Sequence, residues 1–310
     1  MTPFTVTELW SFLAERGLVS GQPPLGGEVL VKGASPISAT TDGSLSWMRH
    51  QELDWEGIQA AAVICDQEAS APRGGRVIYI PVKNPRLAFA LAVTRFVAPA
   101  PEPGVAATAL IDPGAVVAPD CGIGPYAVIG GGAVIGRGTV IHSRVSLIGP
   151  VEIGRNCIIH SGAVLGTDGY GYERDEAGRP VKMPHLGGIR IGDEVEIGAN
   201  TCVDRGTLGD TVIGSHTKIG NLCQIGHNAR LGERVMVTCQ AVISGSTVVG
   251  SDSWLAPGAL IGDRLSLGAA SFVGLGAGVT VNVPDDGAVV APPSKKVDGR
   301  IRYLFDYFAD

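Results

Sequence analysis

One feature of this sequence constrains its fold more than any other: an aliphatic residue recurs at every sixth position from Ile111 to Val279. The pattern stops after Leu165, resumes at Ile191 and shifts phase once further on. Glycine very often follows the aliphatic residue. Short, fixed periods of this kind are typical of solenoids, in which each unit stacks on the one before it. The repeat therefore predicts a solenoid over most of the chain beyond residue 110.

Each six-residue unit can form one short strand and one turn, and three units can close a triangular coil. The aliphatic side chain would point inward and stack on its equivalent in the next coil, about 4.8 Å away. The repeat is long enough for about eight coils. A tight corner needs a small residue, and the fifth position of the unit is often small. Small residues at this position include Ala115, Cys121, Ala127, Ala133, Cys157 and Ala163.

This hexad pattern resembles that of the left-handed parallel β-helix proteins, most of which are acyltransferases. The left-handed sense is implied by the resemblance alone, because parallel crossovers in general are right-handed. We therefore expect a mainly β fold: a left-handed parallel β-helix of hexapeptide repeats, with a small N-terminal α/β domain and a short C-terminal tail or helix. A three-sided prism with apolar faces would bury them in a homotrimer.

Residues 1–100 lack the repeat and carry helix and strand signals of their own. Thr5 and Glu8 have the spacing of a capping box, which predicts a helix at about 6–16. Asn84-Pro85 predicts the start of a second helix. Short apolar runs predict strands at Val29–Val31, Ala61–Cys65 and Val77–Val82.

The β-helix is expected over residues 101–284, and a tail with a short helix at Ile301–Phe308 over residues 285–310. An insert at residues 167–188 interrupts the hexads. Inserts in solenoids form loops on one face and often serve binding. The side chains of the insert that we expect to bind a substrate are Tyr170, Tyr172, Lys182 and His185.

Composition excludes several classes of function. The net charge of −6 argues against general attraction to nucleic acid or to anionic membranes. No apolar run is long enough to span a bilayer, and no basic region precedes an apolar run at the N-terminus. We therefore expect a cytoplasmic protein without an integral membrane segment. The cysteines form no CxxC pair, and Cys121, Cys157 and Cys223 occupy the small position of a hexad, so core packing explains them better than a thiol site.

The histidines include one stacked pair and one strong catalytic candidate. His142 and His160 occupy the same hexad position, so they should stack at one corner, either as exposed side chains or as donors along a ligand cleft. His216 is expected at a solvated corner. His227, which stands in the segment QIGHN, is the best candidate for catalysis.

The central segment makes a second resemblance more specific. Residues 181–214 read VKMPHLGGIRIGDEVEIGANTCVDRGTLGDTVIG, with GTDGYGY before them and NLCQIGHN after them. This block closely resembles the UDP-3-O-acylglucosamine N-acyltransferases of lipid A biosynthesis, and the similarity extends over nearly the whole chain. The pieces Leu45-Ser46-Trp47 and 84–90 resemble that family's uridine-binding domain. The resemblance thus implies a nucleotide-binding role for residues 1–100, with Trp47 stacking on the base.

The resemblance also implies a reaction and its residues. Such enzymes transfer an acyl group from a 3-hydroxyacyl carrier protein to the 2-amine of UDP-3-O-acylglucosamine. They need no cofactor beyond the phosphopantetheine-borne thioester of the co-substrate. His227 matches the general base, a role that suits an imidazole. Gly245 matches the residue whose backbone N–H stabilises the oxyanion. The amide side chains expected to line the cleft, or instead to cap corners, are those of Asn221, Gln224 and Asn228.

Four departures from the family pattern keep an alternative open. Gly220 stands where the family has a carboxylate, Leu53 lies in a region where it has an aromatic residue, and Arg264 replaces a histidine. The C-terminal extension is also short. A paralogue that acylates another nucleotide-linked amino sugar or amine, or that uses acyl-coenzyme A as donor, would explain these departures. The sequence leaves the length and 3-hydroxylation of the acyl chain open.

Two further readings come from the same fold. A zinc hydratase would need three histidine ligands around one metal. The spacing of His216 and His227 matches neither one coil nor neighbouring strands, so we expect no metal site. A non-catalytic scaffold or sugar-nucleotide sensor is the other reading, and His227 together with Gly245 argues against it.

Overall fold

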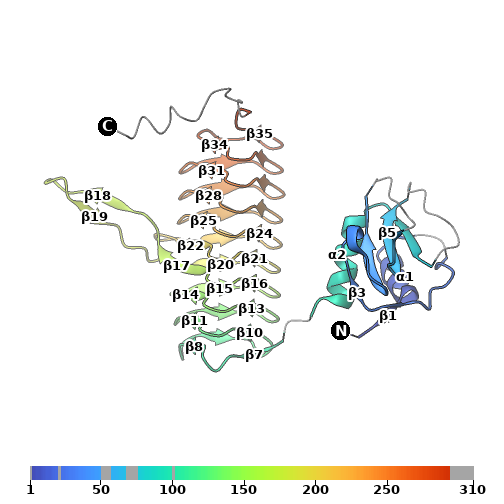
Figure 1. Ribbon diagram of the computed structural model, residues 1–310. Helices are drawn as coiled ribbons and strands as arrows, with labels where there is room; N and C mark the ends of the chain where they lie inside the picture. The colour runs from blue at the N-terminus through green and yellow to red at the C-terminus, as the bar shows by residue number, and fades with distance from the viewer. Residues whose placement is uncertain (1, 20–21, 50–56, 68–75, 100–101, 294–310) are drawn as a thin grey trace, which may run out of the picture. The chain divides into compact units, whose positions relative to one another are not determined.

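The computed structural model describes residues 2–19, 22–49, 57–67, 76–99 and 102–293. The chain divides into two compact units, Met1–Ala100 and Pro101–Asp310. This division coincides with the end of the repeat-free region. Figure 1 draws the first unit in blue to teal and the second, a stack of coils, in green to red.

The first unit contains a parallel four-stranded sheet of order β3-β4-β5-β6, a separate antiparallel pair β1-β2, and short helices. Its elements are β1 (Phe4–Thr5), α1 (Val6–Ala14), β2 (Leu30–Val31), β3 (Gly33–Ala34), η1 (Ile37–Ala39), β4 (Ser44–Trp47), β5 (Ala62–Asp66), β6 (Ile78–Val82), α2 (Pro85–Ala92) and the π-helical turn η3 (Val93–Val97).

Both predicted helices are confirmed, and their caps explain where they begin. The Thr5 side chain accepts a hydrogen bond from the Glu8 backbone, while the Glu8 carboxylate accepts one from Thr5. These bonds also lower the pKa of Glu8. Asn84 Oδ1 accepts from the Leu87 N–H at 3.2 Å and starts α2. The three predicted strands correspond to β2, β5 and β6, whereas β1, β3 and β4 were not predicted from the pattern.

The second unit is a left-handed parallel β-helix of three sheets. The ten-stranded sheet contains β7 (Gly104–Val105), β10 (Gly122–Ile123), β13 (Val140–Ile141), β16 (Ile158–Ile159), β21 (Glu196–Ile197), β24 (Lys218–Ile219), β27 (Met236–Val237), β30 (Trp254–Leu255), β33 (Phe272–Val273) and β35 (Ala288–Val289). The nine-stranded sheet contains β8 (Leu110–Ile111), β11 (Val128–Ile129), β14 (Ser146–Leu147), β17 (Val164–Asp168), β22 (Cys202–Arg205), β25 (Gln224–Ile225), β28 (Val242–Ile243), β31 (Leu260–Ile261) and β34 (Gly278–Val279). The eight-stranded sheet contains β9 (Val116–Val117), β12 (Val134–Ile135), β15 (Val151–Ile153), β20 (Ile189–Ile191), β23 (Thr211–Ile213), β26 (Arg230–Leu231), β29 (Val248–Val249) and β32 (Ser266–Leu267).

The hexad residues form the core as predicted. The repeated aliphatic residues are buried from Ile123 onward, and only partly buried at Ile111 and Val117; they pair in register from coil to coil, as Ile129 does with Leu147. The small fifth-position residues beside them are buried except Ala115, which is partly buried, and burial raises the thiol pKa of Cys121, Cys157 and Cys223. Sheets of ten, nine and eight strands make about nine coils rather than eight. The difference arises because β7 and β35 extend the stack beyond the recognisable hexads.

The insert forms a β-hairpin that projects from the side of the coils (Figure 1). Its strands are β18 (Tyr172–Arg174) and β19 (Pro180–Lys182), paired antiparallel. At its base β17 and β22 continue past the hexad length, and their register shifts between Leu165 and Thr167. The insert therefore leaves the solenoid at the nine-stranded sheet.

Within the described ranges, no helix has the length and apolar character needed to cross a bilayer. The predicted terminal helix at Ile301–Phe308 lies outside those ranges.

Candidate active site

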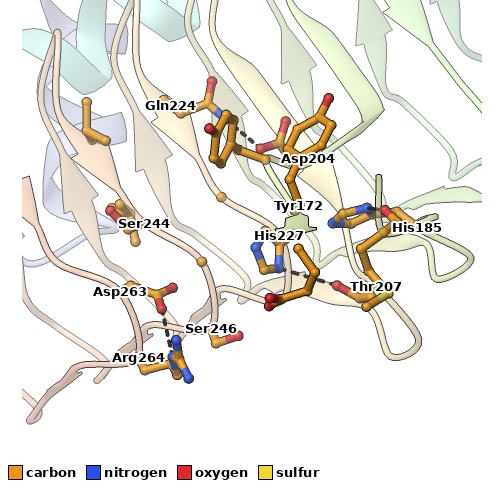
Figure 2. Close-up of a pocket in the computed structure, with 18 residues that line it drawn as sticks. Tyr172, His185, Asp204, Thr207, Gln224, His227, Ser244, Ser246, Asp263 and Arg264 are labelled. Carbon is orange, nitrogen blue, oxygen red and sulfur yellow. Dashed lines mark hydrogen bonds and ion pairs between the residues drawn. The ribbon is translucent and has the colours of Figure 1, made fainter. Parts of the chain in front are cut away.

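One pocket of about 820 Å³ lies in the second unit, between the insert and the corners of successive coils (Figure 2). Its walls combine residues far apart in sequence. They are Tyr170, Gly171, Tyr172, Glu173, Met183, His185, Asp204, Thr207, Gln224, Gly226, His227, Val242, Ile243, Ser244, Gly245, Ser246, Asp263 and Arg264.

His227 and Gly245 meet in this pocket because they occupy the same corner of adjacent coils. Strands β25 and β28, which precede these two corners, pair in register, with Ile225 opposite Ile243. A Cβ placed on Gly245 would lie 2.6 Å from His227 Nε2, so no side chain fits there. The predicted pair is therefore brought together, and the imidazole lies against bare backbone.

The N–H of Gly245 is free to bind an oxyanion. The neighbouring Ser246 N–H donates to the His227 carbonyl at 2.8 Å, which fixes this corner. The described residues offer the Gly245 N–H no hydrogen-bond acceptor, whereas side chains cap the N–H of Ala199 and Asp193 at other corners. An unpaired donor beside a candidate base is what a tetrahedral oxyanion requires.

Asn228 fixes the tautomer of His227. Its Oδ1 accepts from the Thr207 N–H at 3.0 Å, and its Nδ2 donates to the Gly209 carbonyl at 3.0 Å, so the amide cannot be flipped. This oxygen lies 3.1 Å from His227 Nδ1, which must therefore carry the proton and donate. Thr207 Oγ1 lies 3.5 Å from the same nitrogen. The lone pair of His227 is thereby left on Nε2, the nitrogen that lies against Gly245.

The structure assigns different duties to the three predicted amide side chains. Gln224 lines the pocket. Asn228 lies outside the pocket lining and contacts His227 Nδ1, so its place is that of a positioning residue for the candidate base rather than of a substrate contact. Asn221 also lies outside the lining, and its Oδ1 accepts from the Ala199 N–H at 2.7 Å. Corner capping, the alternative raised from the sequence, is what the geometry supports for Asn221.

His185 is the most enclosed polar residue of the pocket, with only 3% of its surface exposed. Its Nδ1 donates to the Met183 carbonyl at 3.0 Å, because a carbonyl can only accept. Its Nε2 therefore carries a lone pair, and this buried atom has no hydrogen-bond partner in the described residues. The ring meets that of His227 edge to face, with centroids 5.1 Å apart.

Asp204 is a pocket residue that sequence reasoning missed. It belongs to β22, and its carboxylate accepts from Gln224 Nε2 at 2.8 Å and from Thr167 Oγ1 at 3.2 Å. Burial raises the pKa of this carboxyl above its usual value, against the opposing effect of these hydrogen bonds and of His227 and His185 nearby. The only sequence signal was its place in the block VDRG. Thr207, Ser244, Ser246 and Asp263 were missed as well.

The other predicted insert residues divide into lining and anchoring groups. Tyr170 and Tyr172 line the pocket, with their rings in edge contact and Tyr170 88% exposed. Lys182 does not line it, but pairs with Asp168 at 2.5 Å across the base of the hairpin. This pairing lowers the pKa of Asp168 and raises that of Lys182.

Arg264 stands at the pocket wall where the family pattern has a histidine. Its Nε lies 2.7 Å from Asp263, so the pair presents little net charge. The region of Leu53 lies outside the described ranges.

Trp47 belongs to the first unit, where its half-buried ring lies 6.2 Å from that of Phe89. Stacking on a nucleotide base stays a prediction. Burial raises the thiol pKa of Cys65, in the neighbouring strand β5, to about 11.

The predicted histidine stack is confirmed but lies apart from the pocket lining. The rings of His142 and His160 are nearly parallel, with centroids 5.1 Å apart, and Glu196 lies 2.7 Å from His160 Nε2. His216 lies at a corner, half exposed, 3.3 Å from Glu194.

The part of the chain that the structure describes contains no cluster of three or more His, Cys, Asp or Glu side chains able to hold a metal ion.

Comparisons with known proteins identify the family and the fold. The family model described as "Bacterial transferase hexapeptide (six repeats)" matches residues 132–167 and 210–245. The UDP-3-O-acylglucosamine N-acyltransferase of Verminephrobacter eiseniae is 52% identical over 68% of this chain and 66% of its own length. That of Chlorobium chlorochromatii is 51% identical over 29% of this chain and 25% of its own length. The chain thus matches two thirds or less of the length of these relatives.

Solved structures give the same fold. The UDP-N-acetylglucosamine acyltransferase of Francisella novicida superposes with a TM-score of 0.56 at 25% identity, covering 61% of this chain and 67% of its own. LpxA of Acinetobacter baumannii superposes with a TM-score of 0.54 at 25% identity, covering 66% of this chain and 78% of its own. The hexapeptide repeats, the close sequence relatives and these folds together place the chain in the UDP-3-O-acylglucosamine N-acyltransferase family of left-handed β-helix proteins.

Proposed function

We propose that this protein transfers an acyl group from a thioester donor to the amine of an amino sugar, with UDP-3-O-acylglucosamine as acceptor and a 3-hydroxyacyl carrier protein as donor. The observation that carries the proposal is His227 Nε2 lying against the bare backbone of Gly245 in a pocket. A base and an oxyanion donor at adjacent corners are the two groups that acyl transfer to an amine needs.

The reaction follows from the positions of these groups. The amine nitrogen attacks the thioester carbonyl carbon, and the developing oxyanion accepts a hydrogen bond from the Gly245 N–H. His227 Nε2 takes a proton from the attacking nitrogen, while Asn228 holds the Nδ1 proton in place. The C–S bond then breaks, the sulfur leaves with a proton from the imidazolium, and the amide is released. This route needs no covalent acyl-enzyme and no cofactor beyond the phosphopantetheine that carries the donor.

The remaining roles are proposed from the family. The acceptor nucleotide would contact the first unit, with Trp47 stacking on uracil, and the insert tyrosines Tyr170 and Tyr172 would cover the sugar. A homotrimer would bury the apolar outer faces of the coils. A carrier-protein donor would place the reaction in the cytoplasm.

A second candidate is supported by Gly220 and Arg264. Gly220 supplies no carboxylate near the base, and Arg264 brings a guanidinium to the pocket wall. A paralogue that acylates another nucleotide-linked amino sugar, with acyl-coenzyme A as donor, would fit both features.

A substrate panel separates the two candidates. Amide formation is measured by mass spectrometry with UDP-3-O-acylglucosamine and other UDP-amino sugars, each with the acyl chain on carrier protein or on coenzyme A. The proposal predicts the highest kcat/KM for the 3-O-acylglucosamine acceptor with carrier protein. No turnover of this pair, with turnover of another, would select the paralogue.

A further inference from the structure

We propose that Asp204 makes the pocket select an amine over a hydroxyl acceptor, by binding the charged acceptor nitrogen beside His227. This inference rests on the proposed acyl transfer and adds the group that recognises the nucleophile.

The carboxylate of Asp204 is held rigidly at the pocket wall. Gln224 Nε2 donates to Oδ2 at 2.8 Å, and Thr167 Oγ1 donates to Oδ1 at 3.2 Å. Each oxygen keeps a further lone pair. The Asp204 carbonyl accepts from Thr211 Oγ1 at 2.7 Å, which fixes the backbone of β22 as well. Both carboxylate oxygens can therefore accept from a ligand without rearrangement.

The charge of Asp204 is uncompensated. Within the described residues it forms no ion pair with Lys or Arg, whereas the pocket's other β-helix carboxylate, Asp263, is paired with Arg264 at 2.7 Å. The titratable groups that act on Asp204 are the imidazoles of His227 and His185. Burial raises the pKa of Asp204. Burial without a partner cation makes the charged form of this carboxyl unfavourable, and a cationic ligand would relieve that cost.

A sugar amine supplies the complementary charge. An aliphatic amine close to a nucleotide phosphate is largely protonated at neutral pH, by comparison with an ordinary α-amino group of pKa about 8. A sugar hydroxyl is uncharged. Asp204 therefore attracts the ammonium form of the acceptor. A hydroxyl at the same position of the sugar would gain no comparable electrostatic attraction.

Each proton that the acceptor nitrogen loses has a defined destination. The bound ammonium loses one proton to solvent and becomes the nucleophile, which remains hydrogen-bonded to Asp204. The nitrogen then attacks the thioester, and His227 Nε2 removes a second proton and passes it to the leaving sulfur. The nitrogen keeps one hydrogen in the amide. Asp204 forms no covalent bond and is not consumed. His185 lies edge to face against His227, and its buried Nε2 is not exposed to a ligand.

The test compares two ligands that differ only at the nucleophile. Binding of UDP-glucosamine and UDP-glucose is measured by calorimetry on the wild-type protein, on Asp204→Asn and on Asp252→Asn. Asparagine keeps the shape of the side chain and removes its charge. Asp252→Asn is the matched control, because it makes the same change outside the pocket lining, at a β-helix carboxylate that lies 2.7 Å from Arg234. We expect the wild type and the control to prefer the amine, and Asp204→Asn to lose about 10- to 100-fold of that preference, as for a charge-assisted hydrogen bond.

Turnover provides the second arm. The same proteins are given UDP-3-O-acylglucosamine or its 2-hydroxyl analogue with the thioester donor, and the ratio of amide to ester is measured. That ratio should fall in Asp204→Asn alone. An equal preference for both ligands on the wild type, or a preference that Asp204→Asn leaves intact, overturns the inference. The wild type could prefer the amine ligand and yet turn over neither substrate. That result would overturn the proposed function but not the inference that Asp204 binds an amine. If Asp204→Asn does not fold, Asp204→Ser removes the same charge.

Discussion

The imidazole of His227 lies against the backbone of Gly245 so closely that a Cβ at Gly245 would come within 2.6 Å of Nε2. The contact arises because both residues occupy the same corner of successive coils, after strands whose register is fixed by the aliphatic core. The missing side chain leaves a space bounded by an acceptor nitrogen on one coil and a free N–H on the next. This space is where the carbonyl of a thioester would react.

Gly245→Ala should abolish this space without unfolding the protein. The methyl group would displace the imidazole or block the carbonyl, and we expect kcat/KM to fall by about 100-fold or more, the scale of a lost oxyanion donor. Gly278→Ala is the control, because nothing lies within 4 Å of a Cβ at Gly278. Circular dichroism and steady-state kinetics check both variants. Normal activity in Gly245→Ala would contradict the proposed oxyanion site.

Asn228→Ala should release the tautomer of His227. Without the Oδ1 acceptor, the nearest remaining group is Thr207 Oγ1 at 3.5 Å, and the proton can move to Nε2. We expect kcat to fall by about 10-fold or more, with little change in the KM of the acceptor. Nitrogen-15 NMR of the imidazole reports the tautomer directly.

The control for Asn228→Ala is Asn200→Ala. Both asparagines have a left-handed backbone, with φ of 60° and 55°, so both substitutions carry a similar conformational cost. Only Asn228 contacts the base. Equal losses of kcat in the two variants would mean that Asn228 acts through stability alone.

Asp204→Asn should stabilise the fold at neutral pH while it weakens amine recognition. The pKa of Asp204 is raised in the folded protein, so its contribution to stability is full below the ordinary value of 3.8 and is lost as the pH rises through the raised value. At neutral pH the buried charge is a net cost, which asparagine removes. Calorimetric unfolding should therefore give a higher Tm for the variant at neutral pH, with the difference shrinking in acid. A Tm below that of the wild type throughout would contradict this.

Lys182→Met should loosen the hairpin modestly. The ion pair with Asp168 is partly exposed, with 53% of the lysine side chain accessible, so solvent screens it and its contribution to stability is small. Tyr170 and Tyr172 would be held less firmly, and we expect the acceptor KM to rise a few-fold while kcat is kept. Hydrogen exchange of the hairpin amides gives an independent measure. A large loss of kcat would instead indicate direct contact between Lys182 and the reacting groups.

The sequence predicted those parts of the structure that depend on local periodicity. Every inward position of the β-helix repeats the same chemistry, so Ile129 and Leu147 are placed by the same rule. The His142–His160 stack and the His227–Gly245 contact follow from that rule, because equivalent corners lie one above the other. The capping box at Thr5 is equally local.

The pocket's chemistry was less accessible, because it depends on where the insert folds. Asp204 becomes a pocket residue only because β17 and β22 run past the hexad length and the hairpin returns His185 to the same wall. Asn221 and Asn228 look alike in sequence, yet Asn221 caps a neighbouring corner and Asn228 contacts the imidazole of the proposed base, His227. Lys182 points to a partner at the hairpin base rather than to the pocket. None of these distinctions can be predicted from the hexad repeat, because none of them recurs along the sequence.

The central claim is that His227 is the base of an amide-forming acyl transfer, and single-turnover kinetics test it most directly. Wild type and His227→Ala are mixed with UDP-3-O-acylglucosamine and a 3-hydroxyacyl carrier protein, and acceptor binding is measured in parallel. We predict that the rate of amide formation falls by about 100-fold or more in the variant while acceptor binding is retained. Amide formation at the wild-type rate by His227→Ala would show that another group is the base and would contradict the account.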